Sequence, residues 1–257
     1  MKTISFVNQK GGVGKTTSAV NVGACLADQG RRVLLVDLSD QGSLSISYGF
    51  REIGADELTT YEVLKGADIK SAIRPIRENL DILPTDIRLS GAELELVSAF
   101  SRETLLKDAL KKVSENYDFT LIDCPQSLGL LTLIALTASD EVIVPVKADY
   151  LALNGMSQLL NTINIVKSRL NPKLEIVGVV MTFYNGQRNL DKQVVEEIER
   201  FFKEKLFSTK ITQNTRLAEA PSTGTDIFRY DHRSSGAIQY KELTNEIIER
   251  EETKNDK

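Results

Sequence analysis

The sequence predicts an α/β fold in which helices cover both faces of a doubly wound, mostly parallel sheet. Apolar segments of strand length alternate with helical segments along the whole chain, which is typical of successive βαβ units. The 257 residues, 41% of them hydrophobic, suit a single globular unit. A glycine-rich loop also joins the first predicted strand to the first predicted helix. We therefore expect one domain over residues 1–250.

Short apolar runs, often β-branched, predict the strands. The run Val33-Leu34-Leu35-Val36 ends on a carboxylate, and the run at 80–83 stops at Pro84. In chain order, the predicted strands are residues 3–7, 32–37, 80–83, 119–123, 142–146 and 174–183. Because the carboxyl ends of parallel strands meet at one edge of a sheet, we expect a ligand to bind there.

Helical periodicity with stop signals predicts the helices. The first has Val20, Ala24 and Ala27 on one face and ends at Gly30, and a later one ends before Asn171-Pro172. The predicted helices are residues 17–29, 59–64, 104–115, 156–170, 190–202 and 234–250. After the last of these, the polar residues 251–257 are expected to form a flexible acidic tail.

Composition excludes several classes of protein. No apolar run approaches the ~20 residues that span a bilayer, and the N-terminus lacks the apolar core of a signal peptide, so a cytoplasmic location is expected. The net charge of 32 − 36 = −4 argues against a partner held by bulk charge, but a local cationic patch could still bind DNA. Cys25 and Cys124 lack a metal-ligand spacing and are expected to be small buried residues.

The loop after the first strand has the composition of a phosphate-binding P-loop in a Rossmann-like sheet. Its glycines allow the backbone N–H groups to point at phosphate oxygens, and the helix N-terminus adds positive charge. Lys15 can reach the β- and γ-phosphates, and the Thr16 hydroxyl can bind Mg²⁺. The common motif would place glycine at position 9, whereas this chain has Gln9 followed by a second lysine, Lys10. The residues expected to bind ATP here are Gly11, Gly12, Val13, Gly14, Lys15, Thr16 and Thr17.

Two carboxylates end apolar strands that are expected to lie beside this loop. Asp37 and Asp123 can hold Mg²⁺ or its water ligands together with Thr16. The alternative for each carboxylate is an ordinary role in strand-end solvation or helix capping.

These motifs carry a resemblance to a known family over nearly the whole chain. The run K-G-G-V-G-K-T at residues 10–16 resembles the deviant Walker A motif of the ParA/MinD family of ATPases. Residues 36–38 with 41–43, and residues 121–125, resemble the next two motifs of that family. Residues 216–222, R-L-A-E-A-P-S, are similar to a segment of the partition branch, ParA/Soj.

The resemblance implies an ATPase of DNA segregation that serves a plasmid, a mobile element or a chromosome. It implies a homodimer that forms around ATP, with Lys10 reaching the partner's nucleotide. It further implies that this dimer binds DNA without sequence preference, in association with the nucleoid, and that a ParB-type partner stimulates hydrolysis. Arg188 and Arg216 match positions that the partition branch uses to bind DNA, although both could be ordinary surface or salt-bridged residues.

The chain also departs from the family pattern. The residue two positions after Asp37 is normally an aspartate that positions the attacking water, but here it is Ser39, followed by Asp40 where proline is usual. We expect Lys10, Lys15 and these three residues to carry catalysis, and hydrolysis to be slow. Gln126 replaces a frequent second proline after Pro125.

Adenine recognition is predicted at Asn185, whose carboxamide offers a donor and an acceptor to a base edge. The alternative is a turn asparagine before Gly186.

Three other functions are alternatives for a P-loop protein of this kind. An ATP-binding switch or scaffold with little hydrolysis is kept open by Ser39. A MinD-like membrane ATPase should end in a basic amphipathic helix, whereas residues 241–257 have a net charge of 4 − 6 = −2, so no membrane partner is expected. An iron–sulfur ATPase needs cysteines in its switch regions, and Cys25 lies within the first predicted helix.

Overall fold

The computed structural model describes residues 1–149 and 156–255. Within them, eight strands form one sheet in the order β3-β4-β2-β5-β1-β6-β7-β8, and every neighbouring pair is parallel except β3 with β4. The strands are β1 Lys2–Phe6, β2 Val33–Asp37, β3 Arg74–Arg77, β4 Leu80–Leu83, β5 Phe119–Asp123, β6 Glu141–Lys147, β7 Glu175–Tyr184 and β8 Leu206–Thr212.

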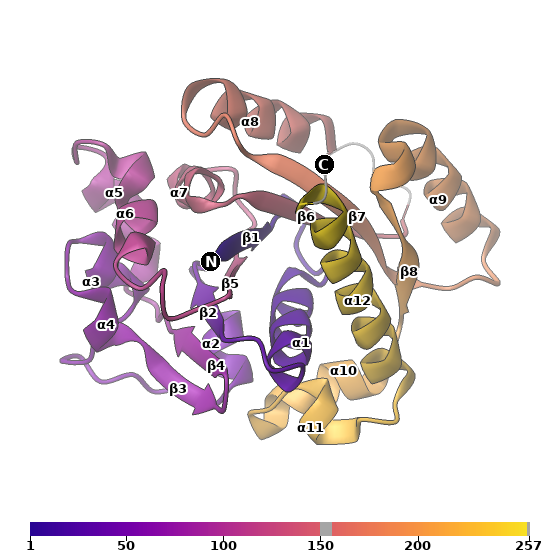
Figure 1. Ribbon diagram of the computed structural model, residues 1–257, viewed down its shortest axis with the longest axis horizontal. Coiled ribbons are helices and arrows are strands. Elements are labelled where there is room, and N and C mark those ends of the chain that lie inside the picture. Colours follow the sequence, from indigo (N-terminus) through magenta and orange to yellow (C-terminus); the bar gives the residue numbers. More distant parts are fainter. Residues whose placement is uncertain (150–155, 256–257) are drawn as a thin grey trace.

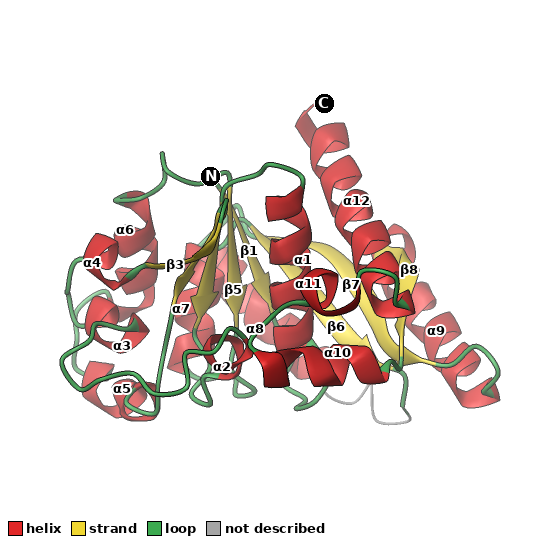
Figure 2. Ribbon diagram, turned by 90° about the horizontal axis from the view of Figure 1, so that it is seen from below, coloured by secondary structure: helices red, strands yellow, loops and turns green. Residues whose placement is uncertain are grey.

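Helices cover both faces of this sheet, as Figures 1 and 2 show. Helices α1 and α12 pack on one face, whereas α6, α7, α8 and α9 pack on the other. The helices are α1 Lys15–Asp28, α2 Ser43–Ser47, α3 Thr60–Leu64, α4 Ile69–Ala72, α5 Leu89–Leu96, α6 Leu105–Lys111, α7 Leu130–Ala138, α8 Met156–Arg169, α9 Asn189–Phe202, α10 Thr215–Glu219, α11 Ile227–Asp231 and α12 Ser235–Asn255. The predicted doubly wound fold is confirmed.

Strand β2 shows why the sheet has two cores. Successive side chains of a strand point to opposite faces. Leu34 and Val36 therefore join the core under α6 to α9, whereas Val33 and Leu35 join the core under α1 and α12. A strand buried on both faces is a continuous apolar run, which is the pattern that the sequence showed.

The structure also contains elements that the sequence analysis did not predict. Helix α7, with the sequence L-L-T-L-I-A-L-T-A, is apolar on nearly all sides and has no helical periodicity to detect. Strand β3 contains Pro75 and pairs only with β4 at the sheet edge, where a missing N–H is tolerated. Strand β8 and the short helices α2, α4, α5, α10 and α11 were likewise not predicted.

The end of α12 differs from the predicted flexible tail. The helix continues through Asn255, and Glu251 is only 7% exposed. Its carboxylate pairs with Lys2 at 2.6 Å, and Lys254 pairs with the buried Glu141 at 2.5 Å. The reason is electrostatic, since a buried carboxylate on β6 is stabilised by cations from β1 and α12. Residues 256–257 lie outside the described part.

All the parallel strands end at the same edge of the sheet. Figure 2 shows this edge opposite the one at which the two ends of the chain lie, with α2 and α10 along it. The motifs found in the sequence follow β1, β2 and β5 at this edge.

Candidate functional site

The loop between β1 and α1 is held in an unusual backbone conformation. Gly12 and Gly14 have φ angles of 67° and 84°, a region in which side chains cause strain. Asn8 fixes the loop to β6, because its Nδ2 donates to the carbonyl of Pro145 at 2.7 Å and its Oδ1 accepts from the amide of Lys10 at 2.9 Å. The loop therefore presents backbone N–H groups and the start of α1 to an anion.

A hollow of about 370 Å³ opens over this loop. Besides the loop and the first turn of α1, the residues around it come from three other strand ends. These residues are Ser39, Gln41, Ser43 and Ser47 after β2, Cys124 and Gln126 after β5, and Phe183 near the end of β7.

Lys15 is the buried cation of this hollow. Lys15 is 7% exposed, and its Nζ donates to the carbonyl of Lys10 at 3.4 Å. Burial lowers the pKa of Lys15, and the nearby Asp123 charge partly offsets that effect. An anion bound in the hollow would stabilise this ammonium group.

Thr16 lines the hollow and is hydrogen bonded to Asp123, which is fully buried and does not line it. The Thr16 hydroxyl donates to Asp123 Oδ2 at 2.6 Å, whereas the buried Oδ1 has no partner within residues 1–149 and 156–255. Burial, followed by the charge of Asp37, raises the pKa of Asp123. A hydroxyl beside a buried carboxylate with one oxygen left over fits Mg²⁺, which prefers oxygen ligands.

Asp37 is arranged differently from Asp123, although the two residues are partners in the sheet register. It is fully buried and accepts three hydrogen bonds, from the amide of Ser39 at 3.1 Å and from the amide and hydroxyl of Ser45 at 2.8 and 2.7 Å. Burial raises its pKa, which the Ser45 hydrogen bonds oppose. Asp37 therefore fixes the loop after β2 and does not line the hollow.

The structure separates Ser39 from Asp40. Ser39 is 8% exposed and lines the hollow, and its Oγ accepts from the amide of Gln41 at 3.3 Å. Asp40 is exposed and is not among the lining residues. Of these two adjacent candidates, only Ser39 lies where a bound phosphate would be.

The second lysine of the loop is held within its own chain. Lys10 forms an ion pair with Asp149, which follows β6, and both side chains are partly exposed. Lys10 is not among the residues that line the hollow of its own chain.

A second, smaller hollow of about 90 Å³ adjoins the first beside Gly14 and Thr17. Its wall contains Phe183, whose φ of 52° is strained for a residue with a side chain, as is frequent at functional sites. The other lining residues are Thr182, Ile211, Thr212, Asn214, Leu217, Ala218 and Tyr240. A mainly apolar slot of this kind suits a flat aromatic base.

Asn185 does not line this slot. Its Oδ1 accepts from the amide of Gln187 at 3.0 Å, and its own amide donates to Asp191 at 2.7 Å, as in a turn. Residues 211–218 were not predicted to belong to the site because strand β8 was not predicted. The run Thr209-Lys210-Ile211-Thr212 is rich in β-branched residues and could have indicated this strand.

The two arginines proposed for DNA differ in their surroundings. Arg188 is exposed at the start of α9. Arg216 on α10 is half exposed and pairs with Glu219 at 3.1 Å and with Asp231 at 3.7 Å. Arg216 is thus found in the salt-bridged state that the sequence analysis weighed as its alternative.

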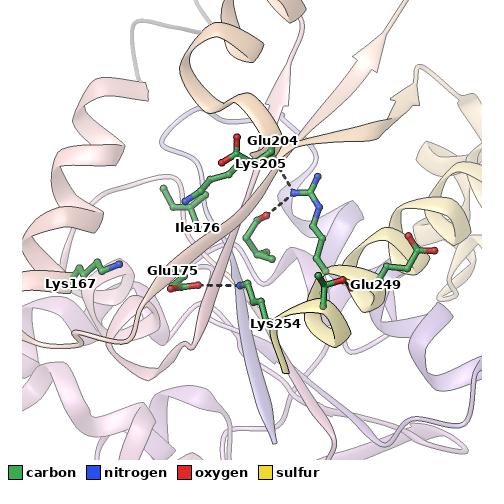
Figure 3. A pocket seen from close by; sticks show the side chains of 10 residues that line it. Lys167, Glu175, Ile176, Glu204, Lys205, Glu249 and Lys254 are labelled. Carbon is green, nitrogen blue, oxygen red and sulfur yellow. Dashed lines mark hydrogen bonds and ion pairs between the residues drawn. The ribbon is translucent and has the colours of Figure 1, made fainter. Parts of the chain in front are cut away.

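A larger hollow of about 490 Å³ lies at the opposite edge of the sheet, between the start of β7 and the end of α12 (Figure 3). Three of the seven charged side chains that line it are engaged with other described residues. Arg250 donates to the carbonyls of Val177, Lys205 and Leu206, and Lys254 pairs with Glu175 at 3.2 Å. No motif of the sequence reaches this hollow, so the site is the one at the carboxyl edge.

Over the described part of the chain, no helix combines the length and hydropathy that crossing a membrane requires.

Comparison with known proteins places the chain among nucleotide-binding relatives. A family model described as an AAA domain matches residues 1–176. The sporulation initiation inhibitor protein Soj of Bacillus subtilis is 49% identical over 247 residues, with 96% of this chain and 98% of the relative covered. The chromosome-partitioning ATPase Soj of Treponema pallidum is 47% identical over 253 residues, with 97% and 98% covered.

A solved structure gives the same fold. Cobyrinic acid a,c-diamide synthase from Mycobacterium smegmatis, with a bound ATP analogue and magnesium, superposes with a TM-score of 0.85 at 35% identity. The match covers 96% of this chain and 94% of the other.

Proposed function

Because this chain belongs to the Soj/ParA family of P-loop ATPases, we propose that it acts in DNA segregation as an ATP-dependent dimer that binds DNA. One observation carries the proposal: Lys15 and Thr16 line one hollow, Thr16 is hydrogen bonded to the buried Asp123, and a second lysine, Lys10, belongs to the same loop. The replicon served is a plasmid, a mobile element or a chromosome.

ATP with Mg²⁺ is the ligand of this hollow. The loop amides and Lys15 bind the phosphates, and Thr16 with Asp123 holds the cation. The cation supplies positive charge that neutralises the phosphate oxygens during hydrolysis. Asp37 acts indirectly, by fixing the loop that carries Ser39 and by adding negative charge behind Asp123.

The adenine base occupies the slot beside Gly14. Phe183, Ile211 and Leu217 offer apolar surface to its faces, and Asn214 is the amide side chain in the wall. This assignment replaces the role that the sequence suggested for Asn185.

The position of Lys10 outside its own phosphate hollow is the basis for the proposed dimer. A lysine that lies outside its own phosphate hollow can reach the γ-phosphate of a second copy, which is the physics of an arginine finger supplied in trans. Such a lysine exchanges the Asp149 carboxylate for a phosphate, so the dimer depends on ATP.

DNA binding uses the exposed Arg188 together with Arg216. Phosphate contacts of this kind are insensitive to sequence and sensitive to salt. Arg216 must leave Glu219 and Asp231 to take part, at small cost because exposed ion pairs are weak. A ParB-type partner then stimulates hydrolysis and releases the DNA, in the nucleoid region of the cytoplasm.

Two alternatives have less support. A MinD-like membrane ATPase would free a basic C-terminal helix, whereas the end of α12 is acidic and anchored through Glu251 and Lys254. A scaffold that binds ATP with little hydrolysis differs from the proposal only in turnover.

The decisive experiment measures binding to several unrelated DNA duplexes with ATP, with ADP and without nucleotide. We expect binding only with ATP, with similar affinities for all duplexes. Equal binding with ADP, or strong preference for one sequence, would refute the proposed function.

A further inference from the structure

Gln126 stands over the phosphate loop from the end of β5. It is exposed, and its side chain lies against Gly11: a Cβ added to Gly11 would come within 2.5 Å of Oε1 and 3.2 Å of Nε2. In residues 1–149 and 156–255, its carboxamide makes no hydrogen bond with another residue, so its donor and acceptor are available to a ligand.

The loop has a direction that locates the terminal phosphate. The adenine slot adjoins Gly14 and Thr17, so the α-phosphate lies at that end. Lys15, which reaches the β- and γ-phosphates, directs Nζ to the carbonyl of Lys10 at the other end. Because Gly11 follows Lys10, Gln126 stands at the γ-phosphate end.

Several polar side chains line the hollow and could orient a water molecule. None of the described residues that line it is a carboxylate, and residue 39, which lines it, is a serine with a neutral hydroxyl. The lining also contains the hydroxyls of Thr16, Thr17, Ser43 and Ser47 and the carboxamides of Gln41 and Gln126, all of which can donate and accept. Of the two carboxamides, that of Gln126 lies against Gly11, at the γ-phosphate end of the loop.

We propose that the Gln126 carboxamide orients the water that attacks the γ-phosphate. The inference rests on the proposed ATPase function. The water oxygen forms a bond to the γ-phosphorus while the bond to the β–γ bridging oxygen breaks, and ADP leaves with that electron pair. One water proton passes to a phosphate oxygen. Gln126 Oε1 accepts a hydrogen bond from the water throughout and takes no proton, as glutamine does in other phosphoryl-transfer sites.

The proposal explains how a chain with serine at position 39 can still hydrolyse ATP. A neutral amide can orient water, and it does not increase the negative charge that the buried carboxylates Asp37 and Asp123 already place near the site.

The test compares Gln126→Ala with Gln41→Ala and with Ser127→Ala, a neighbouring exposed residue outside the hollow. Single-turnover hydrolysis with saturating ATP and Mg²⁺ should fall about 10–100-fold in Gln126→Ala, less than fivefold in Gln41→Ala and not at all in Ser127→Ala. The KM for ATP should stay within about threefold, because water orientation belongs to the transition state.

Analogue binding gives a second readout that does not depend on turnover. ADP with aluminium fluoride mimics the transition state with its in-line water, whereas ADP with beryllium fluoride mimics bound ATP. Gln126→Ala should weaken the first complex by the factor lost in rate and leave the second unchanged. Gln126→Asn, which keeps the amide but shortens its reach, should be intermediate, and thermal unfolding confirms that each variant is folded.

Normal hydrolysis in Gln126→Ala, or equal weakening of both analogues, would overturn the inference, since the latter indicates a structural role. A different result would refute the proposed function. A wild-type protein that hydrolyses ATP but does not bind DNA refutes the DNA function and leaves this inference standing.

Discussion

Lys10 and Asp149 form an ion pair within one chain, although 139 residues separate them in the sequence. The pair joins the phosphate loop after β1 to the end of β6. In this arrangement the ammonium group of Lys10 is neutralised by its own chain and does not enter its own phosphate hollow. The lysine proposed to bind a partner's nucleotide therefore stays paired with Asp149 until a γ-phosphate competes for it.

The Lys10→Ala variant tests this role in dimerisation. A hydrogen bond to a charged group contributes about 1.5–3 kcal/mol, so the ATP dimer should weaken roughly 10–100-fold. ATP binding to the monomer should change less than about threefold. Sedimentation at micromolar protein with ATP and with ADP measures both states, and Lys70→Ala on α4 is the matched control. A wild-type protein of equal mass with both nucleotides would contradict the prediction.

The Asp149→Asn variant tests whether the ion pair with Asp149 competes with dimerisation for Lys10. Removing the carboxylate should lower the ATP concentration needed for dimerisation, by at most about fivefold because exposed ion pairs are weak. The same sedimentation assay, run as an ATP titration, measures it. Dimerisation that requires more ATP would show that Asp149 supports the dimer instead.

DNA binding should respond to the charges around Arg216. Arg216→Glu and Arg188→Glu should each weaken binding to unrelated duplexes by similar factors and reduce the salt slope by about one per lost contact. Glu219→Gln should tighten binding slightly, since it releases Arg216. Lys111→Glu on α6 carries the same charge change away from these residues. Normal binding by Arg216→Glu would show that the arginine is only part of a surface ion pair.

Substitutions at Ser39 and Asp40 should affect ATP turnover differently. Ser39 lines the hollow and Asp40 does not, so Ser39→Asp should raise phosphate release and Asp40→Ala should leave it within about twofold. A positioned carboxylate typically contributes 10²–10⁴-fold, and the gain should be smaller, about tenfold, because positioning dominates phosphoryl transfer. The assay is phosphate release with DNA present. If Asp40→Ala abolishes turnover and Ser39→Asp has no effect, Asp40 is the working carboxylate.

Removal of the metal should eliminate the stabilisation by ATP. At an ATP concentration about 100-fold above its dissociation constant, binding adds about 2.7 kcal/mol, which raises the melting temperature by roughly 5–10 °C. EDTA should remove most of this shift. Asp123→Asn should do the same, because it keeps an acceptor for Thr16 but loses the negative charge. Asp108→Asn, exposed on α6, should behave like wild type, and a full shift in Asp123→Asn would refute its metal role.

The end of α12 should contribute to stability. Glu251→Gln, or deletion of residues 251–257, should reduce the free energy of unfolding by about 1–3 kcal/mol, less than for a fully buried pair because Lys2 and Lys254 are partly exposed. Glu252→Gln is the exposed control. Equal melting temperatures of wild type and the deletion variant would show that the segment is dispensable.

The difference in the free energy of unfolding between wild type and Glu251→Gln should depend on pH in a direction that the pKa shifts define. Burial lowers the pKa of Lys2, but the ion pairs with Glu251 and Glu141 outweigh this and raise it. Burial raises the pKa of Glu251, but its interactions with Glu141 and Lys2 lower it overall. A raised lysine pKa gives stability that is lost at high pH, and a depressed carboxyl pKa gives stability that is lost at low pH. The difference between wild type and Glu251→Gln should be full between about pH 5 and pH 10 and shrink outside that window.

The sequence by itself determined the features that depend on neighbouring residues. The phosphate loop could be predicted because its glycines, Lys15 and Thr16 are adjacent in the chain and must follow a strand and open a helix. The parallel strands could be predicted because burial on both faces requires continuous apolar runs, as in β2 and β5.

Only the tertiary structure decided the surroundings of these residues. Asp37 and Asp123 both end strands, but Ser39 and Ser45 occupy the two oxygens of one while the other keeps a free oxygen beside Thr16. The contacts of Gln126 with Gly11 and of Lys10 with Asp149, and the adenine slot formed with β8, join segments distant in sequence. Local patterns report backbone preference and burial, whereas the order of strands in the sheet sets which distant side chains meet.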